Sequence, residues 1–421
     1  MHKMKDSGVE WIGEIPEKWK LIRFKDKYIN CKEIAKEQSS EFERLALTLK
    51  GVIKRGKDDS EGLQPKEFDG YQVLKENDFV FKMIDLQNIS TSRVGLSQYT
   101  GLVSPAYIRF APRTKGQYNK FIYYFLMSLY YNCVYNKLGG NGVRSALNAK
   151  DMGDFKVPFP DEFLQKAIGS YLDEKCAQVD SLISNVQSQI EKLKAYKQSL
   201  ITEVVTKGLY PNAPMKDSGV EWLGKVNASY SIQSMRSIFK IKKDIIGREP
   251  EIVLSITQKG LRVKNISENE GQMAASYASY QIVNIGDFAM NHMDLLTGGI
   301  GIAEIAGVTS PDYRVFVMKN PMNCAKYFLY VLETYYRNKV FYAFGKGAAN
   351  LGRWRLPAQN FNTILIPVPS ISEQFKIAEV LEDKCYKINR LMEIKQTKIE
   401  KLEQYKRSLI YEYVTGKKEV T

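Results

Sequence analysis

Histidine is nearly absent from this chain of 421 residues, which holds only His2 and His292. A zinc site built on histidine is therefore nearly excluded, and we expect no metal site. The five cysteines lie far apart, are odd in number and form no Cys-x-x-Cys pair, so a disulfide framework is not expected. This cysteine usage fits a reducing compartment, and we expect the protein to be cytoplasmic.

Long apolar runs are also missing. The most apolar stretch, residues 121–135, is too short to span a bilayer and includes Ser128 and Asn132. We interpret it as part of a buried helix over 120–138, repeated at 326–344. No apolar segment follows the first basic residues, so neither a signal peptide nor a membrane partner is expected.

Catalytic motifs are absent as well. The chain has no phosphate-binding GxxxxGK[ST] loop, and Gly299-Ile300-Gly301 lacks the third glycine of a dinucleotide-binding turn. Asn320-Pro321-Met322 is not the tetrapeptide with which amino-methyltransferases bind a target base. Glu382 and Lys384 could mimic part of a nuclease site, but such pairs arise by chance at this charge density. We therefore predict a chain that is non-catalytic on its own and binds no cofactor itself.

The most informative feature present is an internal repeat. The decapeptide at residues 4–13, MKDSGVEWIG, returns at 215–224 as MKDSGVEWLG. Further matches follow in order, including Tyr71-Gln72 with Tyr280-Gln281 and Pro158 with Pro367. A repeat unit of about 210 residues is a duplicated domain with its own core, not a solenoid repeat. Two copies of one module indicate a partner that itself has two halves.

The charge indicates what kind of partner this is. There are 61 Lys and Arg residues against 47 Asp and Glu, which gives a net charge of +14. Such a basic chain favours a polyanionic partner such as nucleic acid. The alternative is a basic surface that takes no part in binding.

Each half divides into two parts. The first is a mixed region of short β-rich runs and turn signals, which predicts an α+β globule. The second is a long helix, blocked before its start by Val157-Pro158-Phe159-Pro160, capped by Asp161 and ended by Gly208 and Pro211. The predicted boundaries are a first globular domain at 1–160, a helix at 161–210, a second globular domain at 211–369 and a second helix at 370–421.

Apolar residues in both helical segments follow an imperfect seven-residue rhythm with polar interruptions at Gln189, Lys395 and Lys398. The pattern favours one helix packing on one partner, most simply the other copy. If the two helices pair as an antiparallel coiled coil, a pseudo-two-fold axis relates the two halves. The alternative is two separate helices, each packed on its own globule. The residues predicted to pair the helices are Val179, Leu182, Val186, Leu193, Tyr196, Leu200, Ile388, Leu391, Leu402, Tyr405 and Leu409.

Two basic, glycine-bounded loops recur in both halves with different side chains. Glycine lets a backbone approach a ligand closely, arginine and asparagine read guanine and adenine edges, and lysine neutralises phosphates. Each loop taken singly could be an ordinary solvated turn, but one scaffold with diverged loops suits two different half-sites. The candidate DNA-binding residues are Lys50, Lys54, Arg55, Asn141 and Arg144 in the first half, and Lys259, Arg262, Lys264, Lys346, Asn350, Arg353 and Arg355 in the second.

With these features, the whole chain resembles the specificity subunit of type I restriction-modification systems. The resemblance is carried by the opening Ser7–Gly13 and by the stretch from Val157-Pro158-Phe159-Pro160 to Ser199-Leu200-Ile201. It recurs from Ile366-Pro367-Val368-Pro369 through Glu373-Gln374 to Ser408-Leu409-Ile410. Leu164 departs from the family's usual Glu-Gln pair, whereas the second copy keeps Glu373.

The resemblance implies two target-recognition domains, each reading one half of a split double-stranded DNA sequence. It also implies that the paired helices set the spacer and dock two modification subunits. Those partners would hold S-adenosylmethionine and methylate adenine, and added restriction subunits would use ATP and Mg and cleave DNA. Two other classes stay open from the residues alone: a self-contained methyltransferase or nuclease with unrecognised motifs, and a scaffold whose globules bind protein.

Overall fold

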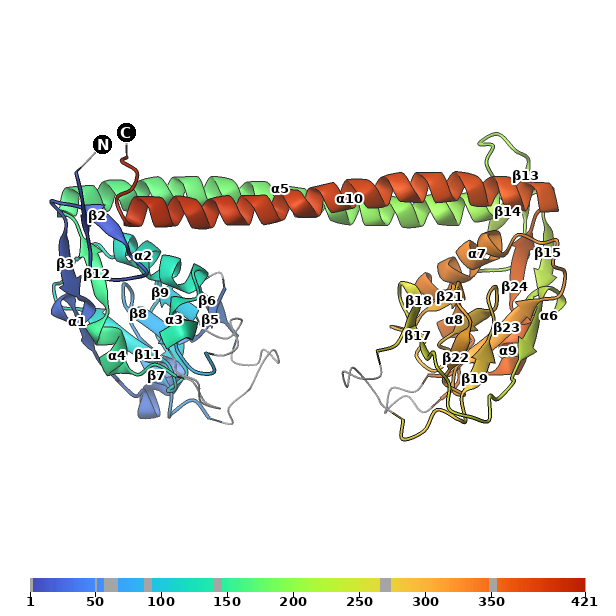
Figure 1. The fold of residues 1–421 in the computed structure, drawn as a ribbon, viewed down its shortest axis with the longest axis horizontal. Helices are drawn as coiled ribbons and strands as arrows, with labels where there is room; N and C mark the ends of the chain where they lie inside the picture. Colours follow the sequence, from blue (N-terminus) through green and yellow to red (C-terminus); the bar gives the residue numbers. More distant parts are fainter. Residues whose placement is uncertain are drawn as a thin grey trace. The chain divides into compact units, whose positions relative to one another are not determined.

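The computed structural model describes residues 3–49, 51–56, 67–86, 93–138, 146–265, 274–347 and 354–420. The chain forms two compact units, one made of residues 1–187 and 396–421 and the other of residues 188–395. Each unit holds one α+β domain and a segment of each of the two long helices, α5 (Glu162–Lys207) and α10 (Ile371–Val414) (Figure 1). Each domain is therefore completed by a helix segment from the other repeat.

The described strands of the domain in the first unit are short and form four sheets. A mixed sheet has the order β6-β5-β10-β7, and an antiparallel sheet has the order β4-β11-β8-β9. Two strand pairs, β1-β2 and β12-β3, stand beside them. The strands are β1 (Met4–Asp6), β2 (Glu14–Pro16), β3 (Lys20–Arg23), β4 (Tyr28–Asn30), β5 (Arg44–Thr48), β6 (Gly51–Arg55), β7 (Gln72–Leu74), β8 (Phe79–Lys82), β9 (Arg93–Leu96), β10 (Gly101–Val103), β11 (Ile108–Pro112) and β12 (Lys156–Phe159).

The helices of this domain are short apart from one, the aromatic α2. They are α1 (Phe24–Lys27), the 3-10 helix η1 (Lys36–Glu41), α2 (Lys120–Tyr131), α3 (Val134–Leu138) and α4 (Ala149–Asp154).

The second unit repeats these strands and α-helices in the same order, without a counterpart of η1 among its described residues. Its antiparallel sheet β16-β23-β20-β21 corresponds to β4-β11-β8-β9, and an isolated parallel bridge between Val253 and Val308 matches the pairing of Arg44 with Leu102. The strands are β13 (Met215–Asp217), β14 (Lys225–Asn227), β15 (Ser231–Ser234), β16 (Phe239–Lys242), β17 (Leu254–Thr257), β18 (Gly260–Val263), β19 (Gln281–Val283), β20 (Phe288–Met290), β21 (Ile300–Ile302), β22 (Gly307–Thr309), β23 (Arg314–Met318) and β24 (Leu365–Val368), and the helices are α6 (Met235–Ile238), α7 (Ala325–Arg337), α8 (Val340–Ala343) and α9 (Ala358–Thr363).

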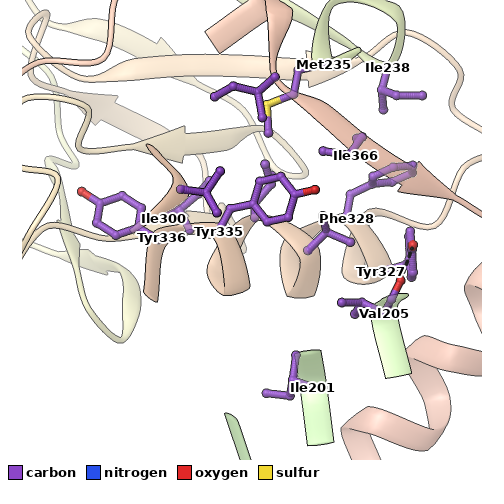
Figure 2. Close-up of a cluster of buried hydrophobic side chains, with 14 of the residues drawn as sticks. Ile201, Val205, Met235, Ile238, Ile300, Tyr327, Phe328, Tyr335, Tyr336 and Ile366 are labelled. Carbon is purple, nitrogen blue, oxygen red and sulfur yellow. Dashed lines mark hydrogen bonds between the residues drawn. The ribbon is translucent and has the colours of Figure 1, made fainter. Parts of the chain in front are cut away.

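One hydrophobic core in each unit joins the antiparallel sheet, the aromatic helix and the long helices. In the first unit the rings of Phe24 and Tyr28 stack at 4.3 Å, and in the second Phe288 stacks on Phe316 at 5.3 Å. Figure 2 shows the second core, where Val205 of α5 lies beside Tyr327 of α7. The Tyr327 hydroxyl lies within hydrogen-bond distance of two carbonyl oxygens, Val205 at 3.2 Å and Pro367 at 2.9 Å, so its single O–H finds an acceptor inside the core.

The helix expected over 120–138 is two helices, which corrects the prediction. Cys133 has φ of 56°, and the second copy breaks at Lys339, whose φ is 59°. A residue in the left-handed region cannot continue a right-handed helix, so α2 and α7 end and α3 and α8 start in new directions. Sequence periodicity did not reveal this break because neither residue is a typical helix breaker.

The ends of α5 follow the predicted signals. An Asp161 carboxylate oxygen accepts the Leu164 amide at 2.8 Å, and Gly208 follows the helix with φ of 84°. Gly169, the one glycine inside the helix, is explained by Tyr118, because a Cβ built on Gly169 would lie 2.2 Å from the Tyr118 hydroxyl oxygen. The second copy has Ala378 and the smaller Cys324 at the corresponding positions.

Salt bridges attach the long helices to the aromatic ones. Lys120 on α2 pairs with Asp173 on α5, and Lys326 on α7 pairs with Glu382 on α10 at 2.6 Å. Glu382 is therefore a structural partner of α7, which accounts for one of the two residues that could mimic a nuclease fragment.

Candidate functional site

The first basic loop is the turn of the β5–β6 hairpin. Thr48 pairs with Gly51, whose φ is 92°, and the Thr48 hydroxyl donates to the Gly51 carbonyl at 3.0 Å. Lys50 lies outside the described residues. Lys54 and Arg55 on β6 line a shallow pocket of about 480 Å³ that also includes Arg44, Glu41 and Glu43. The structure thus gathers two of the predicted residues with a third, unforeseen arginine.

Lys54 is not a free cation. Its ammonium lies 2.5 Å from a Glu43 carboxylate oxygen and 5.2 Å from the centre of the Tyr99 ring. The Glu43 carboxylate raises the pKa of Lys54 above its ordinary value. A DNA phosphate would have to displace Glu43 to pair with Lys54.

The second unit builds the same turn with other side chains. Thr257 pairs with Gly260, whose φ is 93°, and the Thr257 hydroxyl donates to the Gly260 carbonyl at 3.0 Å. Lys259 at the tip and Arg262 on β18 are exposed and make no ion pair with the described residues, whereas Lys264 is half-buried. The backbone of the two hairpins is therefore alike while the side chains that it presents differ.

Only the two ends of the second basic loop, at Lys346 and Arg355, are described, and we call them its neck. Lys346 and Arg355 are exposed and exchange backbone hydrogen bonds of 2.7 and 3.0 Å. Trp354 stacks on Tyr342 with ring centres 5.4 Å apart and would overlap any Cβ at Gly345. Asn141, Arg144, Asn350 and Arg353 lie outside the described residues.

A buried cationic group beside this neck was not found from the sequence. Arg314 is 6% exposed, donates from Nη2 to the Leu356 carbonyl at 2.7 Å and lies over the Phe361 ring. Burial, with Arg314 and Arg355 nearby, lowers the pKa of His292 to about 4, so this imidazole is neutral at neutral pH. The first domain has Met83 and Ile108 at the corresponding positions, so the feature belongs to the second domain alone.

In both units α5 and α10 run antiparallel, side by side. In the first unit Lys406 reaches Asp180 at 2.7 Å and the Tyr413 hydroxyl meets that of Tyr171 at 3.2 Å. In the second unit Lys197 donates to Asn389 at 2.9 Å. Residue numbers rise on one helix as they fall on the other, which is the antiparallel pairing of the two copies that the sequence predicted.

Part of the predicted seam is wrong by one residue. Val179, Val186, Leu200, Ile388 and Leu409 are buried, and Leu193 and Leu402 are half-buried, as expected. In contrast, Leu182, Tyr196, Leu391 and Tyr405 are 49%, 56%, 47% and 55% exposed.

The second row of the seam is instead made by Cys176, Ile183, Ile190, Lys197 and Val204 and their counterparts Cys385, Met392, Ile399, Lys406 and Tyr413. This row was not predicted from the sequence because it contains Lys197 and Lys406, whereas the alternative row contains the apolar Leu182 and Tyr196. A lysine can occupy a seam position when its aliphatic stem is buried and its ammonium finds a partner. Lys395, predicted to interrupt the seam, donates to Gln189 at 2.5 Å.

The four exposed residues fall as one leucine and one tyrosine in each unit, on opposite helices. Leu182 lies two residues after Asp180, and Tyr405 lies next to Lys406, to which Asp180 is bonded. Tyr196 and Leu391 hold the same places beside Lys197 and Asn389 in the second unit. We call each of these an exposed Leu–Tyr pair. The chain thus presents the same apolar feature twice.

No described helix combines the length and apolar character of a membrane span. No group of three or more His, Cys, Asp or Glu residues in the described part of the chain is arranged to hold a metal ion.

Comparison with known proteins agrees with this architecture. Residues 17–192 match the type I restriction modification DNA specificity domain. The chain is 23% identical over 397 residues to the type I restriction enzyme MjaVIII specificity subunit of Methanocaldococcus jannaschii, covering 89% of this chain and 88% of that protein. It is also 23% identical over 405 residues to the putative MjaX specificity subunit of the same organism, covering 88% of each.

The fold has a counterpart among solved structures. A chain from work on complex assembly and conformational transition of the type I R-M system superposes with a TM-score of 0.65, covering 95% of this chain and 98% of that one. At 10% identity this likeness shows the fold alone. Together with the two curated relatives and the matched domain, it agrees with the duplicated α+β domains and paired helices, and the chain is similar to type I restriction-modification specificity subunits.

Proposed function

We propose that each α+β domain reads one half of a bipartite DNA target. The observation that carries the proposal is the pair of hairpins β5–β6 and β17–β18, which share one turn geometry and present different side chains. At corresponding positions, Ile53 and Lys54 in the first domain stand against Arg262 and Val263 in the second. Identical scaffolds with different exposed groups suit two different base sequences.

The paired helices α5 and α10 are proposed to set the spacer and to dock the modification subunits. Support comes from the two exposed Leu–Tyr pairs, since an apolar surface that appears at the same place in both units is suited to two copies of one partner. Methylation and DNA cleavage, with S-adenosylmethionine, ATP and Mg, are assigned to partner subunits.

The decisive experiment is co-expression with the neighbouring modification subunit in a host that lacks it, followed by single-molecule sequencing for methyladenine. We expect methylation at one split motif with a fixed spacer. Replacing residues 1–160 with those of another specificity subunit should then change one half of the motif only. A soluble complex without a new methylated motif would contradict the proposal, as would a change in both halves.

The docking surface has its own test. Tyr196→Ser with Tyr405→Ser removes one ring from each exposed pair and should weaken co-purification of the modification subunit. The matched control is Tyr210→Ser, a ring that is 67% exposed just beyond α5. Equal recovery of the modification subunit with the double variant and the control would show that the pairs do not dock it.

A further inference from the structure

A pocket of about 820 Å³ opens in the first unit where its domain meets the start of α5. This volume lies in the range of small-molecule sites. The wall contains three aromatic side chains, Trp19, Tyr118 and Phe159. Five lysines also line it: Lys3, Lys18, Lys20, Lys27 and Lys115.

The three acidic residues of the lining are already engaged. Glu17 pairs with Lys3 at 2.9 Å, and Glu162 pairs with Lys166 at 2.7 Å. Asp161 accepts the Leu164 amide as the cap of α5. None of these three carboxylates therefore forms an ion pair that neutralises the charge of the other four lysines.

Four lysines stay without a carboxylate partner among the described residues. Lys18, Lys20 and Lys115 are exposed, and the Lys27 ammonium lies 5.2 Å from the centre of the Phe159 ring. Their like charges repel one another, and a bound anion would relieve that repulsion. The first turn of a 46-residue helix adds a further positive potential at the same place.

The second domain shows that the fold does not need these lysines. Its strand pair β15–β24 matches β3–β12 residue for residue, with Ser231 opposite Val368 where Lys20 lies opposite Phe159. The positions of the four unpaired lysines carry uncharged residues there, namely Ser229, Ser231, Ile238 and Pro321. The positive pocket is thus a property of the first domain and not of the shared scaffold.

We propose that this pocket binds a phosphate-bearing ligand. Lysine ammonium groups on flexible stems pair with phosphate oxygens as point charges without demanding one fixed geometry. The phosphate can come from a free nucleotide or from the DNA backbone outside the target. The proposal goes beyond base reading, because the pocket includes none of the hairpin or neck residues assigned to DNA recognition.

The test compares the full chain with two triple variants of equal charge. The pocket variant is Lys18→Ser, Lys20→Ser and Lys115→Ser. The control is Lys225→Ser, Lys240→Ser and Lys243→Ser in the second unit, where each lysine is exposed and without an ion pair to a described residue. ATP is titrated by calorimetry, and a duplex without the target motif is titrated over a range of salt concentrations.

For a nucleotide ligand, the pocket variant loses about tenfold or more in ATP affinity, which corresponds to about 1.4 kcal/mol, while the control keeps it. For the DNA backbone, the slope of log K against log salt falls by about 0.9 for each lost phosphate contact, and by more than in the control. The proposal is overturned if the pocket variant binds both probes as the control does, or if the wild-type chain binds neither.

Two further readouts keep these outcomes distinct. If the pocket variant is unstable, millimolar pyrophosphate should still raise the melting temperature of the wild-type chain, and no rise would count against the pocket. The methylated motif, measured on the same preparations, reports on target reading alone. If the methylated motif persists while both variants bind both probes equally, the proposal of a phosphate-binding pocket is refuted and the proposed function still stands.

Discussion

Replacing Arg109 with valine should destabilise the first domain strongly. The Arg109 Nε donates to an Asp78 carboxylate oxygen at 2.6 Å, and both side chains are only 4% exposed. Burial raises the pKa of Asp78 despite this partner, so the carboxylate depends on the guanidinium to remain charged inside the domain. The second domain keeps the acid as Asp287 but pairs it with Lys242 at 2.8 Å, and Val315 stands where the first domain has Arg109.

The size of the effect follows from what Arg109→Val leaves behind. Asp78 retains the amide of Lys75 at 2.9 Å but loses its only buried cation among the described residues. Removing one partner of a buried ion pair costs about 3–5 kcal/mol. At about 1.4 kcal/mol per factor of ten, the opening of the β8–β11 region should become roughly a hundred to several thousand times more frequent.

Hydrogen exchange read by mass spectrometry measures that opening in the full chain, with β20 of the second unit as an internal reference. The rescue is Cys31→Lys in the Arg109→Val background, because Cys31 holds the place of Lys242. Exchange in β8 should slow back toward the wild-type rate. If Arg109→Val leaves the hydrogen-exchange rate of β8 unchanged, or if the added lysine restores none of the lost protection, then Asp78 does not depend on a buried cation as argued.

Two further predictions use the same logic. Gly169→Ala should lower the melting temperature because the added Cβ would overlap Tyr118, even though alanine favours the helix by about 1 kcal/mol relative to glycine. Tyr118→Cys in the same chain should restore the melting temperature. Since the pKa of His292 falls from 6.5 to about 4 on folding, the unfolded chain binds the proton more tightly. The second unit should therefore lose stability as pH falls from about 6.5 to 4, and His292→Met, the residue of the first domain, should abolish that loss in pH-dependent denaturation; an unchanged pH profile would contradict it.

The fold was predictable where the sequence states it twice. The repeated decapeptide, the proline-blocked starts of the helices and the caps Asp161 and Gly208 are local signals whose meaning does not depend on the rest of the molecule. The pairing of the helices followed from the seven-residue rhythm, whereas its antiparallel direction was implied by the family resemblance. The breaks at Cys133 and Lys339 were not predictable, because tertiary packing imposes their left-handed conformation and neither residue favours it.

The seam shows why apolar pattern alone can be off by one residue. The first row of the seam can be combined with a second row three residues after it or four residues after it. The row with Leu182 and Tyr196 is three residues after the first row, and these two apolar side chains favoured it over the correct row. The correct row contains Lys197, whose place is decided by Asn389 on the opposite helix. Likewise, His292 and Arg314 are more than twenty residues apart in the sequence and meet only because β20 and β23 pair in the sheet.

Duplication makes each half a control for the other, and it separates two kinds of exposed residue. Leucine at 182 and 391 and tyrosine at 196 and 405 are apolar, half exposed and the same in both copies. Leaving them in water gains no burial for the isolated chain, so their repetition favours one kind of partner that covers both. The hairpin positions differ between copies on an unchanged backbone, which favours two different ligand surfaces. The proposed function, in which one subunit joins identical partners to two unlike half-sites, uses both kinds of residue.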